Sequence, residues 1–196
     1  MNTTSRNHLN QDLFAEAAIR CFNKYGPQRT SMADIAEEAG ASRQSIYRFF
    51  EDRSALVQYI LERRITNMAR SLKKEFSTYS TVDEGLVEGS LASIRIARQD
   101  QLFNSIVVNS TDHSLELFLV RASEEIRDIM AANWAPLLQQ ARENSRIRDG
   151  ITDEQIMEWI RHVHTVMMIR DDESEDAQRA LLQNFFLPSV LRRLGP

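Results

Sequence analysis

A cluster of polar residues between positions 42 and 48 has the side chains needed to recognise DNA. It consists of Ser42, Arg43, Gln44, Ser45, Tyr47 and Arg48, with no carboxylate among them. An arginine can bond O6 and N7 of guanine together, and a glutamine can pair with adenine. We therefore expect Arg43 and Gln44 to read bases, and Ser45 to bond a base or a phosphate. Tyr47 and Arg48 are expected on the sugar-phosphate backbone.

The surrounding residues predict the helix-turn-helix that would carry this cluster. In SMADIAEEAGASRQSIYRFFEDR, residues 31–53, apolar residues share one helix face at Met32, Ile35, Ala36 and Ala39. Gly40 then permits a left-handed turn. Ser42 can cap a second short helix, with Ile46 and either Phe49 or Phe50 turned inward. The cluster would then lie on the outer face and enter the major groove.

Two alternatives stay open for the outer face. Tyr47 could belong partly to the core, and Arg48 could pair with Glu51 or Asp52. Helix-turn-helix corners also occur in proteins that do not bind DNA, because a fold does not dictate a function.

Flanking segments complete the predicted domain. A helix at about residues 11–25 carries an apolar stripe that includes Cys21, which we expect to be a packed thiol. Gly26 and Pro27 end that helix. Thr30 or Ser31 at one helix start, and Arg53 at another, are expected to contact phosphates beside the groove.

The run AAIRCFNKYG…TSMADIAEEAGASRQSIYRFFEDRSALV resembles the amino-terminal DNA-binding domain of the TetR family of bacterial one-component transcriptional regulators. The resemblance spans Leu13 to Leu61. It implies a dimeric regulator, by family habit a repressor, that a small molecule releases from a palindromic operator. Two positions depart from the family pattern. Arg53 stands where lysine is more frequent, which keeps the charge, and Ala33 stands where a larger residue often contacts a base.

Composition predicts an all-α protein. Of 196 residues, 42% are hydrophobic, and only six glycines and four prolines would break helices. We expect a helix-turn-helix domain at residues 1–52 and a helical domain at 53–196, which the resemblance assigns to ligand binding and dimerisation. No apolar run approaches a membrane span and the start MNTTSRNHLNQD is unlike a signal peptide, so we expect a cytoplasmic protein.

Further helices are expected at about 53–79, 81–98 and 101–109, and from about 114 to 146 with Pro136 bending or interrupting the last. Residues 153–170 and 174–194 predict two helices that are apolar beyond a single stripe, which indicates burial on more than one side. The resemblance implies that these two pair with a second copy as a four-helix bundle. The alternative is that they form only the core of their own domain.

A small-molecule pocket is implied by the resemblance, and the central and late helices supply apolar and aromatic candidates. These are Phe103, Ile106, Val107, Phe118, Met130, Trp134 and Trp159, with His162 as a polar anchor. Each of them could instead be an ordinary core residue. The sequence does not identify the ligand.

Enzymatic activity is not expected, because no phosphate-binding glycine loop, HExxH or Gly-x-Ser-x-Gly motif is present. No metal or cofactor is expected either. The formal net charge is −4, but residues 1–55 contain seven basic and seven acidic residues, so the remainder carries all of it. The predicted DNA-binding domain can therefore still attract phosphate locally. The remaining alternative is a helical adaptor that binds only protein.

Overall fold

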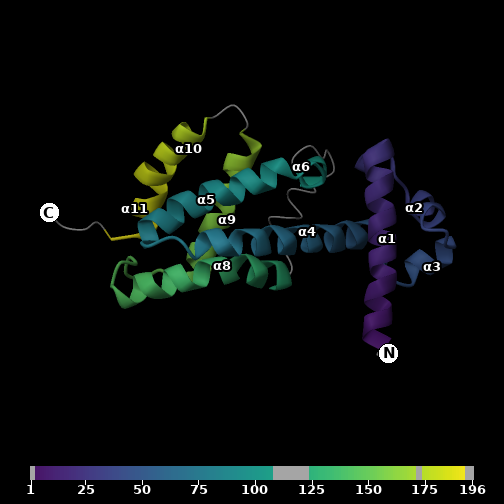
Figure 1. Ribbon diagram of the computed structural model, residues 1–196, viewed down its shortest axis with the longest axis horizontal. Helices are drawn as coiled ribbons and strands as arrows, with labels where there is room; N and C mark the ends of the chain where they lie inside the picture. Colours follow the sequence, from purple (N-terminus) through teal and green to yellow (C-terminus); the bar gives the residue numbers. More distant parts are fainter. Residues whose placement is uncertain (1–2, 108–123, 171–173, 193–196) are drawn as a thin grey trace. The chain divides into compact units, whose positions relative to one another are not determined.

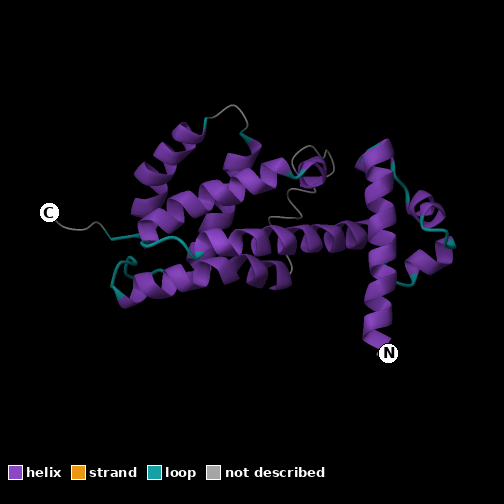
Figure 2. Cartoon of the chain, viewed as in Figure 1, coloured by secondary structure: helices purple, strands orange, loops and turns teal. Residues whose placement is uncertain are grey.

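The computed structural model describes residues 3–107, 124–170 and 174–192. These residues form helices joined by turns and loops, without a β-strand, so the expected all-α fold is confirmed (Figure 2). No helix in the described ranges is both long and apolar enough to cross a membrane.

The helices follow one another as shown in Figure 1. Their bounds are α1 (Thr3–Tyr25), η1 (Pro27–Arg29), α2 (Met32–Glu38), α3 (Arg43–Tyr47), α4 (Arg53–Phe76), α5 (Val82–Gln99), α6 (Gln101–Val107), α8 (Glu124–Glu143), α9 (Asp153–Ile169), α10 (Glu175–Leu181), η2 (Leu182–Phe186) and α11 (Leu187–Val190). η1 is a short 3-10 turn and η2 is a π-helical segment.

The expected helices are present, with three differences. The helix expected at 174–194 is divided into α10, the π-helical η2 and α11, which ends at Val190. α1 begins at Thr3, earlier than the position near residue 11 that the apolar stripe indicated. α8 runs through Pro136, so the interruption expected there does not occur. Residues 108 and 109 of one expected helix, and 114–123 of another, lie outside the described residues.

Contacts divide the chain into two compact units, which are described separately. The first contains Met1–Arg64 and the segment that begins at Gln101, and the second begins at Ile65. α4 therefore contributes to both units, and α6 belongs to the first. The predicted domains 1–52 and 53–196 stay a prediction.

The first unit is built on α1. Phe14, Cys21 and Phe22 are buried, as is Ile35 from α2. The hydroxyl of Tyr59 donates a 2.7 Å hydrogen bond to Asp12, which ties the start of α4 to α1. Burial and the nearby Asp12 raise the pKa of Tyr59 to about 12, so this hydroxyl stays a donor at neutral pH.

The second unit is organised around α5, which contacts α8, α9, α10 and α11. Gly89 of α5 allows a close approach, because a Cβ there would lie 2.9 Å from the Phe76 ring and 3.3 Å from the Trp134 ring. These two rings meet edge to face at 4.7 Å. The C-terminal end of α9 is held by Arg98, whose guanidinium donates to the carbonyl of Met167 at 2.6 Å. Glycine on α5 and aromatic rings from α4 and α8 therefore fill the centre of this unit.

His164 of α9 lies in this core. Its side chain is buried, its ring lies 5.8 Å from that of Trp134, and its Nε2 has no hydrogen-bond partner in the described part of the chain. Burial lowers the pKa of His164 to about 4, because the charged imidazolium would lose its hydration. The folded state therefore holds this histidine neutral.

We expect His164 to make folding pH-dependent. Since its pKa is about 4 when folded and about 6.5 when unfolded, the unfolded chain binds more protons between these values. The contribution of His164 to the free energy of unfolding should fall as the pH is lowered through this window, by up to about 1.4 kcal/mol per pH unit. Urea unfolding at fixed protein concentration measures this for the wild type and His164→Phe.

The exposed His162 on the same helix provides the control. His162→Gln should keep the pH dependence of the wild type, and His164→Phe should reduce it. Equal slopes for wild type and His164→Phe between about pH 6.5 and 5 would contradict the assignment.

Candidate nucleic-acid interface

A tight corner joins α2 to α3 in the first unit. Ser31 caps α2 in a reciprocal box, since its Oγ accepts from the backbone of Asp34 at 3.2 Å and the Asp34 carboxylate accepts from the Ser31 backbone at 2.8 Å. These bonds from Ser31 lower the pKa of Asp34. Gly40 then adopts φ of 66°, the left-handed conformation expected from the sequence.

The second helix of the corner, α3, has one buried anchor and an exposed outer face. Ser42 caps it by accepting from the Ser45 backbone at 3.2 Å. Ile46 is fully buried, while Arg43, Gln44 and Tyr47 are exposed. The outer face expected from the sequence is therefore present and accessible.

Arginines on and beside α3 stack on aromatic rings instead of pairing with carboxylates. The guanidinium of Arg43 lies 5.7 Å from the Tyr47 ring, and that of Arg48 lies 5.1 Å from Phe49. Neither arginine forms an ion pair with a carboxylate of the described residues, so Arg48 is not paired with Glu51 or Asp52 here. The alternative that Tyr47 belongs to the core is not supported, because 41% of it is exposed.

Thr30 and Arg53, which were expected to contact phosphates, are bonded to backbone carbonyl groups in the structure. Thr30 is buried, and its hydroxyl donates to the carbonyl of Gly26 at 2.9 Å, so its side chain is not available to a phosphate. Arg53 is half-buried and donates from Nη2 to the carbonyl of Pro27 at 2.6 Å. The sequence could not show either contact, because both depend on how the chain folds back at Gly26 and Pro27. Ser31 remains exposed beside them.

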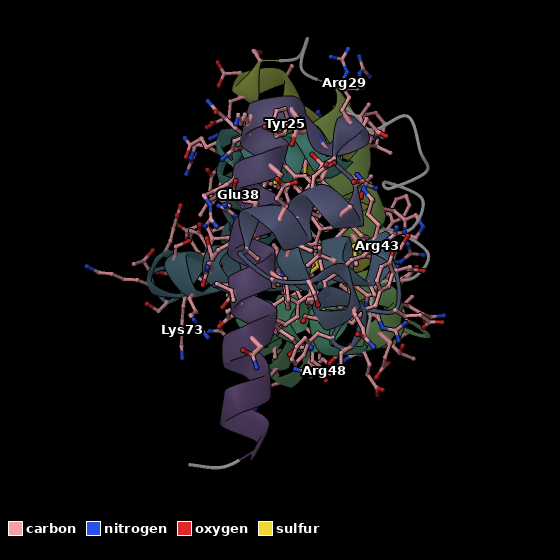
Figure 3. The ribbon with its side chains drawn as sticks, turned by 90° about the vertical axis from the view of Figure 1, so that its right-hand side faces the viewer. Tyr25, Arg29, Glu38, Arg43, Arg48 and Lys73 are labelled. Carbon is pink, nitrogen blue, oxygen red and sulfur yellow. The ribbon has the colours of Figure 1, made fainter. Side chains whose placement is uncertain are left out.

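Arg29 is a candidate that was not among the residues predicted from the sequence. It is exposed at the end of η1 and makes no ion pair with a carboxylate of the described residues. Figure 3 looks onto α2 and α3 and shows Arg29 and Arg48 toward opposite ends of this face, with Arg43 between them. By contrast, Arg20 is paired with Glu38 at 2.6 Å. Only the folded structure separates paired from unpaired arginines.

The candidate ligand residues do not share one environment. Phe103 and Ile106 are buried in the first unit, and Trp134 is buried in the second. Trp159 and His162 are exposed on α9, where the Trp159 indole donates to the hydroxyl of Ser189 at 2.9 Å. The remaining candidates are the half-buried Met130, and Val107 and Phe118, whose side chains lie outside the described residues.

His164, rather than His162, is the buried histidine beside Trp134. A sequence signal for this was available, because His164 follows Ile156 and Ile160 at four-residue intervals and thus falls on the buried stripe of α9. His162, the polar anchor predicted from the sequence, is the exposed neighbour.

One groove of about 490 Å³ lies in the second unit between α8 and α9. Met130 and Ala131 of α8 and Met157 of α9 supply its apolar lining, and Arg161 and several carboxylates supply its polar lining. Of the candidate ligand residues, Met130 lines this groove.

The capped corner and its outward donors have the arrangement of a helix-turn-helix. Residues 15–60 match the family model of bacterial regulatory proteins of the tetR family. An HTH-type transcriptional regulator of Mycobacterium tuberculosis is 24% identical over 185 residues, covering 94% of this chain and 87% of the relative. TtgR of Pseudomonas putida, also an HTH-type transcriptional regulator, is 51% identical over 47 residues, 24% of this chain and 22% of TtgR.

Solved structures share the fold along most of the chain. QsdR, a transcriptional repressor of the TetR family from R. erythropolis, aligns with a TM-score of 0.64 at 17% identity over 96% of this chain and 99% of QsdR. SmeT, the repressor of a multidrug efflux pump of Stenotrophomonas maltophilia, aligns with a TM-score of 0.58 at 18% identity over 93% of this chain and 90% of SmeT. Residues 15–60 thus form a DNA-binding domain of the tetR type, and the relatives support a DNA-binding transcriptional regulator.

Loss of the α3 cap should loosen the interface. Ser42→Ala removes the acceptor for the Ser45 backbone and should lower the free energy of unfolding by about 1 kcal/mol. The short α3 depends on this cap, so DNA affinity should fall as well. Thermal unfolding and DNA titration measure the two effects. Ser42→Asp should restore stability because aspartate also caps helices; a Ser42→Ala variant as stable as wild type would contradict this role.

Proposed function

We propose that this regulator is a repressor that binds a palindromic operator as a homodimer and is released by a small apolar or amphipathic molecule. The observation that carries the proposal is the outer face of α3. Its hydrogen-bond donors are exposed on the side opposite the buried Ile46, and the α3 sequence contains no carboxylate that would pair with them. Such a face fits the major groove, in which base edges offer acceptors.

In this proposal Arg43 reads a base. Its side chain is exposed, and the Tyr47 ring 5.7 Å away restricts its motion without neutralising its charge. Gln44 and Ser45 lie beside it on α3, and in the proposal Arg48 contacts the DNA backbone. One such helix reads only a short sequence, so two copies on a two-fold symmetric site supply the specificity.

The outer face of α9 and of the C-terminal helices is the proposed dimer interface. Four large apolar side chains are exposed there: Trp159, Val166, Ile169 and Phe185, with 70% of Phe185 accessible. Apolar side chains exposed together in a monomer indicate a surface that is covered by a partner. A second copy of this chain covers it in the proposal.

The proposed ligand site is in the second unit. The α8–α9 groove, with Met130 and Met157 in its wall, has the volume of a small-molecule site. A ligand shifts the regulator only if it binds the conformation that does not fit DNA more tightly than the one that does. α4 contributes to both units and is the element through which such a shift would pass.

The function is tested by incubating the purified protein with genomic fragments and sequencing those it retains. A repeated short palindrome supports a dimeric DNA-binding regulator, and the neighbouring genes then suggest ligands. Absence of any enriched sequence at low salt would contradict the proposal.

Arg43→Ala should relax the preference at one base position per half-site, at a cost of about 1–3 kcal/mol for the preferred base. Arg48→Ala should instead weaken binding to all sequences alike, because a phosphate contact carries no sequence information. Binding to a library of single-base variants of the palindrome distinguishes them. Identical profiles for the two variants would show that Arg43 does not read a base.

Phe185→Glu should dissociate the dimer, because it places a charge on an exposed apolar side chain of the proposed interface. Sedimentation should then report a monomer, and affinity for the palindrome should fall well below that of the wild type. Leu13→Glu provides the matched control, since Leu13 is an exposed apolar residue of α1 in the first unit. A Phe185→Glu protein that remains dimeric would place the interface elsewhere.

A further inference from the structure

The guanidinium of Arg53 holds the turn that precedes α2. Its Nη2 donates to the carbonyl of Pro27 at 2.6 Å, and the group lies 5.9 Å from the Phe22 ring. Arg53 is half-buried at the first position of α4. A charge-assisted bond of this length is stronger than a neutral one, so the start of α4 is fastened to the Pro27–Arg29 turn.

The turn is also fixed from its own side. Gly26 adopts φ of 84°, which permits the sharp exit from α1, and the ring of Pro27 fixes the φ of Pro27 itself. The Thr30 hydroxyl donates to the Gly26 carbonyl at 2.9 Å, and the Thr30 backbone donates to Pro27 at 3.3 Å. Arg29, at the end of this turn, therefore extends from a backbone that is held at several points.

Arg29 is exposed and has no carboxylate partner among the described residues, which distinguishes it from the paired Arg20 and Arg63 of the same unit. It shares this state with Arg43 and Arg48, and the three spread over the face that carries α2 and α3 (Figure 3). Unpaired guanidinium groups on both sides of a recognition helix match the phosphates that border a groove.

We propose that the Pro27–Arg29 turn is a phosphate-binding element in which Arg29 contacts the DNA backbone and Arg53 acts as a positioning residue. This inference rests on the proposed binding of a palindromic operator. Arg53 thus takes the role of fixing the turn, and Arg29 takes the phosphate contact that the resemblance implied for position 53.

The experiment measures the dissociation constant of the full-length protein for a labelled duplex carrying the enriched palindrome, across a series of salt concentrations. Each phosphate contact contributes about 0.9 to the slope of log affinity against log salt. Arg29→Ala should lower the slope by about that amount for each bound copy and weaken binding by roughly tenfold at about 0.1 M salt. Lys73→Ala, which removes an equal charge from an exposed position in the second unit, should leave the slope unchanged.

Arg53 is tested in the same assay, alone and together with Arg29→Ala. As a positioning residue, Arg53→Met should weaken binding in the wild-type background, and the double variant should show no further loss of salt slope beyond Arg29→Ala alone. Arg53→Lys should restore binding only in part, because an ammonium lacks the planar fork of a guanidinium. Thermal unfolding confirms that each variant is folded at the assay temperature.

The experiment distinguishes failure of the Arg29 contact, of the Arg53 role and of the proposed function. If Arg29→Ala keeps the wild-type slope, the phosphate contact of Arg29 is wrong while the regulator still binds its palindrome. If Arg53→Met lowers the slope further in the Arg29→Ala background, Arg53 itself contacts a phosphate and its positioning role is overturned. If the wild type binds no palindrome, the proposed function itself fails, whatever the variants do.

Discussion

The burial of Ile46 is the constraint on which the DNA-binding surface depends. α3 has five residues, and so short a helix is not stable by itself in water. It persists because Ile46 is fully buried, Phe50 beyond it is buried, and Ser42 caps its start. When Ile46 faces inward, the helical repeat directs Arg43, Gln44 and Tyr47 outward. The burial of Ile46 therefore sets the orientation of the outer face of α3.

The charge that this surface presents depends on which arginines are paired with carboxylates as much as on how many arginines there are. Arg20 and Arg63 are neutralised by carboxylates on neighbouring helices of the first unit, at 2.6 and 3.1 Å. Arg29, Arg43 and Arg48 are not paired with carboxylates in the described part of the chain. A chain with a formal net charge of −4 can therefore still present arginines without carboxylate partners beside α3, where they can attract phosphate locally.

The proposed mechanism requires ligand binding in the second unit to affect DNA binding in the first, and α4 contributes residues to both units. Its first residue, Arg53, is bonded to the Pro27 carbonyl beside the DNA-facing turn. Further along the same unbroken helix, the carbonyl of Ala69 accepts a 2.8 Å hydrogen bond from the Asn133 side chain of α8 in the second unit. α4 thus makes one of these contacts in each unit. Such coupling requires a difference in ligand affinity between two conformations, not a chain of contacts alone.

The sequence by itself determined the all-α fold, the helix-turn-helix corner, its serine caps and the outward polar face of α3. These features follow from local signals: helical spacing, glycine at a left-handed position, and serine at helix starts. Only the tertiary structure decided the partners of Arg53 and Thr30, the unpaired state of Arg29 and the burial of Trp134 beside His164. Each of these depends on groups that are distant in the chain or on the path of a turn, and residue spacing does not encode which distant groups will meet. The sequence therefore located the helix-turn-helix, and packing decided which of its side chains are buried, paired or exposed.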